Sequence, residues 1–406
     1  MKHFYLVVDR VDTENCGIGT YVEQMLQYPK GEIELSVTII ELDSSESELK
    51  EIEVDGLKYL KIPLRYKGLY RDSGVYYRTV AYLLCTMMDD DKINIFHFNY
   101  LHQYDIAYKM KELCPKAIIW VTVHFVNWVL ALKGNVDKLH SLLREHILKE
   151  SLILKDYIDS GNMLRLADKV IFLSVQTQKT LCDEYKLDMC KSVVIANGIA
   201  DYDIKISKSV RNKIRNSFGF LQNDRIILYS SRLEEGKGVD DLIGAFLILL
   251  KKMPACRLVI AGSGDFNRYF HLVRFCSRIT FVGKLNQKEL YKIYQIADVG
   301  VLLSFTEQCS YTIIEMLMFG LPIIGTTAPG LSEMFEDGIH GIKIKMRKKR
   351  DGSFFYKKSE IVQAFLDFFS NDHKVGIISR NCRAHYERMY SLKTMSDRMA
   401  LLLKAL

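Results

Sequence analysis

The stretch that decides the fold is Arg225-Ile-Ile-Leu-Tyr-Ser-Ser-Arg-Leu-Glu-Glu-Gly-Lys-Gly238, which the amphipathic segment Val239–Lys251 follows. A short apolar run, a loop with glycines and a segment of helical periodicity together predict a buried strand that leads into a helix. The other apolar runs of this kind are Phe4–Val8, Ser36–Ile40, Ile93–His97, Ala117–Val123, Val170–Ser174, Arg257–Ala261, Ile279–Val282, Val299–Leu303 and Pro322–Gly325. Strands that alternate with helices indicate an α/β fold, with parallel sheets covered by helices on both faces.

The length of 406 residues favours two or three domains, each large enough to bury its own core. The strand–helix rhythm restarts after Gly198–Asn223, a segment that is polar, charged and poor in strand signals. We therefore predict two doubly wound, Rossmann-like domains, although no sequence repeat relates the two halves.

Composition bounds the function only loosely. The formal net charge of +7 suits anionic ligands or an anionic membrane surface. Nine scattered cysteines favour a reduced, cytoplasmic location. No secretory leader is recognisable, and no apolar run is long enough to span a bilayer. We expect a cytoplasmic protein that is at most peripheral at the inner membrane face.

Two loops that follow strands carry anion-binding signals. Gly17 and Gly19 open a helix after the first strand, where free N–H groups and close backbone approach suit an anion. Arg232 and Lys237 lie in the loop after Arg225–Tyr229, at the strand end where open α/β sheets bind ligands. Two cations at this position suit a diphosphate, although a surface loop with incidental charges is an equal alternative for this motif in isolation.

A third loop carries Glu307 and Glu315, eight positions apart. The apolar pattern after them predicts a helix from about Tyr311, which places Glu315 in its first turns and Glu307 in the preceding loop. Carboxylates accept hydrogen bonds from sugar hydroxyls, and the N–H groups of Ser310, Tyr311 and Thr312 would suit phosphate or sugar oxygens. The alternative is a helix cap with a solvated glutamate.

Together these loops resemble the GT-B glycosyltransferases of family 4, which are retaining enzymes that use nucleotide sugars. The resemblance covers most of the chain and is strongest from about Val193 to Gly341. The matching motifs, in the order of the family, are Cys16-Gly-Ile-Gly19, Thr122-Val-His124, Asn197-Gly-Ile199, Ser231-Arg-Leu233 with Lys237-Gly238, Ile260–Gly264, Phe281-Val-Gly283, Glu307 to Glu315, and Gly320–Ile323.

The resemblance implies an architecture of two domains across a central cleft. Residues 1–205 would bind the acceptor, residues 206–385 would bind the nucleotide sugar, and a C-terminal helix at 386–406 would pack back on the first domain. The partners implied are a nucleoside-diphosphate sugar, either a UDP- or a GDP-sugar, and a glycan, lipid-linked glycan, peptide or small-molecule acceptor. No further cofactor and no metal are implied, because protein cations stabilise the leaving group.

The resemblance also assigns residue roles. Arg232 and Lys237 would hold the donor diphosphate, and Glu315 would bind the ribose hydroxyls. Glu307 would face the donor sugar, and His124 would approach it from the first domain. The remaining donor contacts implied are Gly17, Gly19, Val282, Lys284, Ser310, Tyr311 and Thr312.

Two departures from the family pattern leave the donor sugar open. Gln308, Cys309 and Ser310 stand where the family commonly has Gly-Phe-Gly, and Cys16 stands where a glycine is usual. Neither change removes a charged group that the motifs need. Cys309 has no evident base beside it and is interpreted as a packing residue.

Other features have simpler interpretations. Asp89-Asp-Asp91 predicts a solvated turn, and His97 and His102 fit structural or acceptor-side roles without metal spacing. Trp128–Leu166 predicts a pair of surface helices, or else a basic amphipathic element for a membrane or the acceptor. Lys343–Lys358 predicts a basic hairpin that turns at Asp351-Gly352.

Three other functions stay open at this stage. A catalytically inactive glycosyltransferase-like binding subunit is disfavoured because the motif cations and both glutamates are intact. A GT-B enzyme of another chemistry, a sugar phosphorylase or an epimerase, remains possible because fold does not fix function. A nucleic-acid-binding protein is poorly supported, since no binding module accompanies the basic charge.

Overall fold

The computed structural model describes residues 1–9, 17–27, 35–63, 65–66, 69–70, 74–145, 151–202, 206–274, 276–350 and 353–406. The chain folds as two compact units. The first comprises Met1–Asn197 together with Met395–Leu406, and the second comprises Gly198–Thr394. The sequence-based limit of 205 lies eight residues after the first boundary, and the limit of 385 lies nine residues before the second.

The first unit contains an eight-stranded sheet in which only the edge strand β3 runs antiparallel to its neighbour. Its strands, in order across the sheet, are β10 (Ser192–Val194), β9 (Lys169–Phe172), β8 (Ile118–Val123), β7 (Ile93–Phe98), β1 (Lys2–Asp9), β2 (Leu35–Ser44), β4 (Leu57–Pro63) and β3 (Lys50–Val54). A separate antiparallel pair joins β5 (Arg65–Tyr66) to β6 (Leu69–Tyr70). The central strands are apolar on both faces, which is expected of parallel strands covered by helices on both sides.

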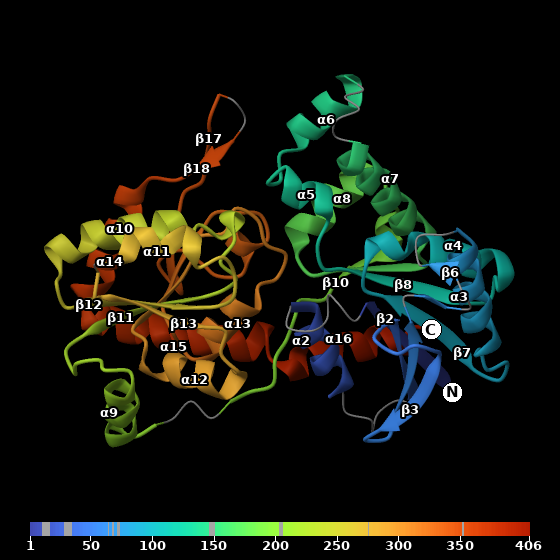
Figure 1. Ribbon diagram of the computed structural model, residues 1–406, viewed down its shortest axis with the longest axis horizontal. Helices are drawn as coiled ribbons and strands as arrows, with labels where there is room; N and C mark the ends of the chain where they lie inside the picture. The colour runs from blue at the N-terminus through green and yellow to red at the C-terminus, as the bar shows by residue number, and fades with distance from the viewer. Residues whose placement is uncertain are drawn as a thin grey trace. The chain divides into compact units, whose positions relative to one another are not determined.

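The helices of the first unit are α2 (Gly17–Leu26), α3 (Gly74–Thr86), α4 (Tyr104–Leu113), α5 (Asn127–Ala131), α6 (Val136–Glu145), α7 (Ser151–Leu166), α8 (Val175–Tyr185) and α16 (Leu392–Lys404), with short 3₁₀ turns η1 (Leu101–Gln103) and η3 (Met189–Lys191). Figure 1 shows α3 and α4 on one face of the sheet and α2 and α16 on the other. The amine of Lys2 donates to the Leu403 carbonyl at 2.6 Å, which ties α16 to β1. The expected helix pair at Trp128–Leu166 is instead three helices, α5 to α7, and residues 146–150 lie outside the described part.

The second unit contains a six-stranded, fully parallel sheet. Its strands, in order across the sheet, are β13 (Ile279–Gly283), β12 (Cys256–Ala261), β11 (Arg225–Ser230), β14 (Val299–Leu302), β15 (Ile323–Thr326) and β16 (Gly341–Ile344). The predicted α/β class with two mostly parallel sheets is confirmed. The expected basic hairpin forms between β17 (Arg347–Lys348) and β18 (Phe354–Phe355), and its turn at 351–352 lies outside the described residues.

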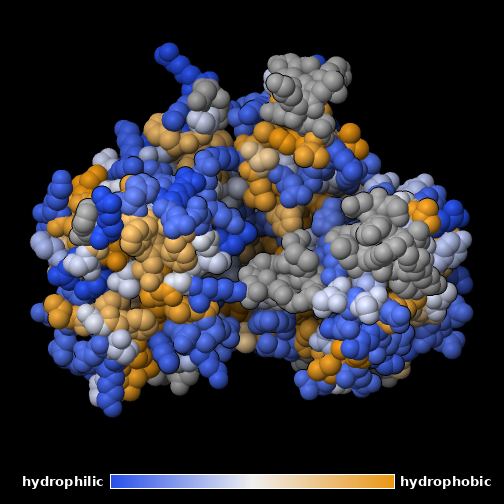
Figure 2. All heavy atoms as spheres, in the orientation of Figure 1, coloured by the Kyte–Doolittle hydropathy of each residue, from blue (hydrophilic) through white to orange (hydrophobic). Residues whose placement is uncertain are grey.

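The helices of the second unit are α9 (Lys208–Ser217), α10 (Val239–Lys252), α11 (Asn267–Val273), α12 (Gln287–Ile296), α13 (Tyr311–Met318), α14 (Lys358–Phe369) and α15 (Asp372–Met389), with 3₁₀ turns η4 (Glu235–Lys237) and η5 (Leu331–Glu333). Figure 1 shows α10 and α11 above the sheet and α12 and α15 below it. On the outer side of α10 and α11, Ile248, Phe270 and Leu272 are exposed, and this area carries hydrophobic colour in Figure 2.

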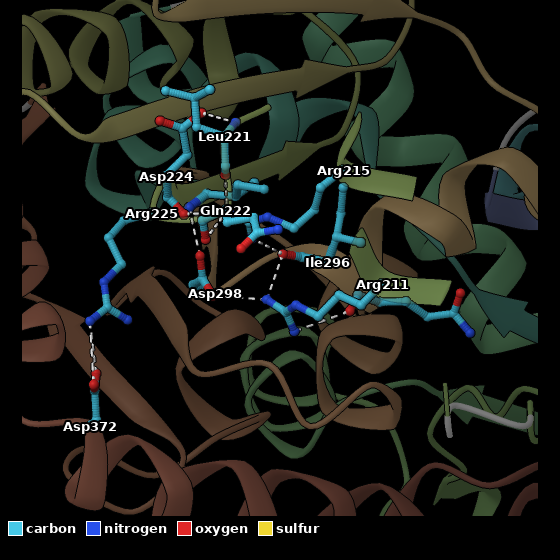
Figure 3. Close-up of polar contacts among 11 residues, drawn as sticks. Arg211, Arg215, Leu221, Gln222, Asp224, Arg225, Ile296, Asp298 and Asp372 are labelled. Carbon is cyan, nitrogen blue, oxygen red and sulfur yellow. Dashed lines mark hydrogen bonds and ion pairs between the residues drawn. The ribbon is translucent and has the colours of Figure 1, made fainter. Parts of the chain in front are cut away.

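Buried polar side chains anchor α9 to the amino end of this sheet (Figure 3). The guanidinium of Arg215, which is 3% exposed, donates to the carbonyls of Leu221, Asp224 and Ile296. Arg211 donates to Asp298 at 3.0 Å, and Asp298 in turn accepts from the Ile226 amide at 2.7 Å. A buried cation surrounded by acceptors in this way holds α9 in one orientation against the sheet.

Candidate active site

Two glycines that follow β12 allow the loop between β11 and α10 to pack closely against the backbone. At Gly262 (φ +150°), a Cβ atom would lie 2.0 Å from the Ser231 carbonyl oxygen, and at Gly264 (φ +147°) it would meet Leu233 at 2.6 Å. The Leu233 amide donates to the Ser263 carbonyl at 2.7 Å. The Ile260–Gly264 motif therefore has a physical role, because only residues without Cβ atoms let the loop that carries Arg232 approach so closely.

Lys237 and Glu307 form the most enclosed ion pair of this edge. The Lys237 amine donates to Glu307 Oε1 at 2.5 Å, and the Ser304 hydroxyl donates to the same oxygen at 2.7 Å. The side chains of Lys237 and Glu307 are only 16% and 12% exposed. Gly330 fixes the loop of Glu307, since a Cβ atom there would lie 2.1 Å from the Glu307 carbonyl oxygen. Two loops thus bring an ammonium group and a carboxylate together at the carboxyl ends of β11 and β14.

Arg232 lies in the same loop as Lys237 but faces solvent. Its guanidinium pairs with Glu234 at 2.8 Å, and the two side chains are 59% and 48% exposed. An exposed pair of this kind contributes roughly 0–1 kcal/mol and is easily exchanged. Arg232 can therefore exchange Glu234 for an anionic ligand with little loss of free energy.

Glu315 lies on α13 and is bonded to a tyrosine that sequence analysis did not single out. Tyr294 of α12 donates to Glu315 Oε2 at 2.9 Å, and its hydroxyl also lies 2.5 Å from Ser230 Oγ. Burial raises the pKa of Glu315 to about 7, and the hydrogen bond from Tyr294 partly opposes that shift. This carboxyl group is consequently poised to change its charge near neutral pH.

The loop before α13 contains Gln308, Cys309 and Ser310, which are the residues that depart from the family pattern. The Ser310 amide donates to Met334 Sδ at 3.2 Å, and the Thr312 hydroxyl donates to the Ser230 carbonyl at 2.7 Å. Tyr311 is the first residue of α13, as the apolar pattern predicted. Cys309 is buried, whereas the buried Oε1 atom of Gln308 has no hydrogen-bond partner among the described residues.

Val282 and Lys284 lie at the end of β13 and just beyond it. The Gly262 amide donates to the Gly283 carbonyl at 2.8 Å, so this segment runs beside the glycine turn after β12. Val282 is half-buried and Lys284 is exposed. The site residues predicted at Arg232 and beyond therefore lie at the carboxyl edge of one sheet, at the end of β13, in the loops after β11, β13 and β14, or on α13.

His124, Gly17 and Gly19 belong to the first unit. His124 follows β8, its Nε2 atom lies 3.0 Å from Asn99 Oδ1, and the Tyr21 ring of α2 packs against it edge-on at 4.6 Å. Burial, with a smaller contribution from nearby His97, lowers the pKa of His124 to about 3. Gly17 and Gly19 begin α2, while Asn15 and Cys16 lie outside the described residues.

Two other expectations concern metals and membranes. Within the described ranges, no group of three or more His, Cys, Asp or Glu residues has an arrangement that would hold a metal ion. No helix in the described part of the chain is both long and apolar enough to cross a membrane. The Asp89–Asp91 segment forms a turn in which Lys92 pairs with Asp89 at 2.8 Å.

Comparison with known proteins supports the resemblance seen in the sequence. Residues 210–351 match the family described as glycosyl transferases group 1. An uncharacterized glycosyltransferase of Methanocaldococcus jannaschii is 32% identical over 180 residues, which are 43% of this chain and 46% of the relative. The chain thus spans about half the length of this curated relative.

Solved structures match over the full chain. Sucrose-phosphate synthase from Thermosynechococcus elongatus superposes with a TM-score of 0.74 and 16% identity, covering 100% of this chain and 99% of that one. Anabaena HepE in complex with UDP and glucose gives a TM-score of 0.71 and 16% identity, covering 100% of both chains. At these identities the likeness concerns the fold, and it confirms the GT-B class expected from the sequence.

Proposed function

With residues 210–351 belonging to the glycosyl transferases group 1 family, we propose that the protein transfers a sugar from a nucleoside-diphosphate sugar to an acceptor hydroxyl, with retention of the anomeric configuration. The observation that carries the proposal is the enclosed pair of Lys237 with Glu307, beside the exchangeable cation Arg232. This edge offers positive charge for a diphosphate and carboxylates for sugar hydroxyls within one set of loops.

In the proposed reaction, the acceptor oxygen forms a bond to the anomeric carbon as the bond from that carbon to the diphosphate breaks. The acceptor proton passes to the departing phosphate oxygen, so no protein nucleophile is needed. Lys237 and Arg232 stabilise the negative charge that develops on the leaving diphosphate, and no metal is required for this step. Glu307 keeps the Lys237 ammonium oriented while its second oxygen faces the donor sugar.

Glu315 is proposed to accept hydrogen bonds from the ribose hydroxyls, with Tyr294 holding the carboxylate in place. Ser310, Tyr311 and Thr312 at the start of α13 would lie near the phosphates, and Val282 and Lys284 near the base. The unpartnered Oε1 atom of Gln308 supports a hydrogen bond to a donor-sugar hydroxyl. The HepE complex named above contains UDP, which favours a UDP-sugar over a GDP-sugar.

His124 and the glycines of α2 are proposed to serve the same reaction from the first domain, residues 1–205, where the acceptor would bind. The low pKa of His124 keeps its imidazole neutral near pH 7, so it would act as a hydrogen-bonding group. The acceptor would be a hydroxyl group of a glycan, lipid-linked glycan, peptide or small molecule, with which the neutral imidazole can form a hydrogen bond. On α7, Leu152, Lys155 and Ile158 are exposed on one helical face, which supports a peripheral membrane acceptor.

The deciding experiment is a thermal-shift panel of UDP, GDP, ADP and their common sugars, with and without EDTA. A ligand present at 100 times its Kd stabilises a protein by about 2.7 kcal/mol, which gives a clear shift. We expect selective stabilisation by UDP and UDP-sugars that EDTA does not remove. Loss of binding in EDTA would contradict the metal-free mechanism, and binding without hydrolysis or transfer would favour the non-catalytic alternative.

A further inference from the structure

A second pocket lies at the opposite edge of the six-stranded sheet from the proposed donor site. It has a volume of about 230 Å³ and includes Arg225, Asp298 and Pro322, which stand at the starts of β11, β14 and β15. The loops of Arg232, Lys237 and Glu307 follow the carboxyl ends of these strands. A ligand in this pocket would therefore not compete directly with a donor at the other edge.

Aromatic rings form part of the wall of this pocket, beside polar groups such as Gln295 and Ser379. Tyr294 of α12, Phe319 just after α13, and Phe368 and Phe369 of α14 belong to the lining. The Tyr294 and Phe319 rings are stacked, with centroids 5.1 Å apart and planes at 10°. Clustered ring surfaces of this kind accept a flat apolar group more readily than a sugar or a peptide chain.

One cation of the pocket is available for a ligand. Arg211 and Asp298 are bonded to each other and to backbone groups of α12 and β11, so they stay paired. Arg225 instead reaches away from that cluster to Asp372, as Figure 3 shows. Asp372 is 74% exposed, so the 3.1 Å pair is weak, and the planar guanidinium of Arg225 can take a carboxylate, phosphate or sulfonate in its place.

We propose that this pocket is an effector site for a small organic anion, with its flat apolar body against the four rings and its anionic group on Arg225. The rings favour an organic anion over an inorganic one, because an inorganic ion would leave the ring surfaces uncovered. The exchangeable Arg225 pair favours an anion over a neutral aromatic compound.

Tyr294 gives the pocket a route to the donor site. Its ring lines the pocket, while its hydroxyl holds Glu315 at 2.9 Å and meets Ser230 at 2.5 Å. A ligand that changes the position of the ring also moves the group that orients Glu315. This coupling rests on the proposed function, since it requires Glu315 to bind the nucleotide.

The binding test uses 8-anilinonaphthalene-1-sulfonate as a probe, because it combines a ring system with one sulfonate and fluoresces in apolar surroundings. The full chain is titrated as wild type, Arg225→Gln, Val375→Trp and Arg268→Gln. Val375 lines the pocket, so tryptophan would fill it, whereas Arg268 forms an exposed pair with Asp240 at 2.9 Å and serves as the matched control.

We expect one saturable site in the wild type and in Arg268→Gln. Affinity should fall about tenfold in Arg225→Gln, through loss of a charged hydrogen bond, and binding should vanish in Val375→Trp. Equal binding by all four proteins, or binding that never saturates, would overturn the site. Circular dichroism checks folding, and Arg225→Gln decides the question if the tryptophan variant misfolds.

The coupling test measures UDP affinity by calorimetry with and without saturating probe. We expect a change of about fivefold in the wild type. The change should disappear in Tyr294→Phe, which keeps the ring and loses the hydroxyl. Equal UDP affinities in the wild type would overturn the effector role. Absence of any UDP binding, with the probe site intact, would instead overturn the proposed function and leave the pocket assignment standing.

Discussion

The carboxyl edges of the two sheets have similar architecture and different electrostatics. In the first unit, His124 bonds to Asn99 and His97 lies 2.6 Å from Thr122. The buried carboxylate of Asp9, at the end of β1, lies 2.8 Å from His102 Nε2 and accepts from Gln103. In the second unit, Lys237 meets Glu307 as an enclosed ion pair, and Glu315 has a pKa near 7.

The difference shows what burial does in the presence or absence of a counter-charge. Desolvation lowers the pKa of His97 and of His124 to about 3, and no carboxylate among the described residues gives either ring an opposing shift. Lys237 and Glu307 compensate the desolvation of each other at 2.5 Å. The two imidazoles are therefore neutral hydrogen-bonding groups, whereas the ion pair supplies a cation beside the proposed diphosphate position.

The largest effect on activity should come from removing the Lys237 ammonium group, which forms the ion pair with Glu307. Lys237→Ala removes a cation from the developing diphosphate charge, so we expect kcat/KM to fall by about 10²–10³-fold. Steady-state transfer or donor hydrolysis measures this loss. Arg268→Ala is the control, because it removes an arginine from an exposed pair of the same unit. Near wild-type rates for Lys237→Ala would remove the basis of the diphosphate assignment.

Glu315→Ala should weaken UDP binding by about 30-fold, because hydrogen bonds between a carboxylate and two ribose hydroxyls would be lost. Calorimetry with UDP measures the change directly. Glu387→Ala deletes an exposed glutamate of the same unit, which pairs with Arg383 on α15, and should leave the affinity unchanged. An unaltered Kd in Glu315→Ala would mean that the ribose lies elsewhere.

For the first unit we expect transfer and UDP affinity to respond differently to a substitution. His124→Ala removes one neutral hydrogen-bonding group, so transfer should slow by about tenfold while UDP affinity stays unchanged. The comparison of kcat with the Kd of UDP separates the two effects. His140→Ala, which removes an exposed histidine paired with Glu184 in the same unit, serves as control. A weaker Kd for UDP in His124→Ala would contradict the separation of roles between the units.

Most of the strands that the sequence predicted are buried on both faces, although β13, which was also predicted, lies at the edge of its sheet and is only partly buried. β1, β8 and β11 consist of nearly continuous apolar residues, which leave little choice but a covered parallel strand. The hairpin of β3 and β4 escaped prediction because Lys50–Val54 is largely exposed and charged, so its alternation carries no hydrophobic signal. β10 is only three residues long, too short for a periodic pattern.

The prediction of site residues from the sequence was limited in the same way. Residues within strand–loop–helix motifs, such as Lys237 and Glu315, could be predicted as site residues because their local spacing places them at a strand end. Tyr294 was missed because on α12 it reads as one more apolar-face aromatic residue, and its partners Ser230 and Glu315 are 64 and 21 positions away in the chain. Long-range hydrogen bonds of this kind leave no periodicity in a single sequence.

The smallest expected effect concerns the charge of Glu315 itself. Burial raises its pKa to about 7 in the free protein, and ribose hydroxyls would donate to the ionised form and lower that pKa in the complex. Binding must then release a proton from protonated Glu315, so affinity for the donor should increase with pH and become constant only above about pH 8. Between pH 6.5 and pH 8 the increase should be about fourfold.

UDP-glucose is the proper ligand, because UDP carries a terminal phosphate that titrates near pH 6 and would mask the effect. Glu315→Gln, which cannot ionise, should bind more weakly and show no dependence on pH. A flat wild-type profile would mean that Glu315 does not contact the nucleotide in its ionised form.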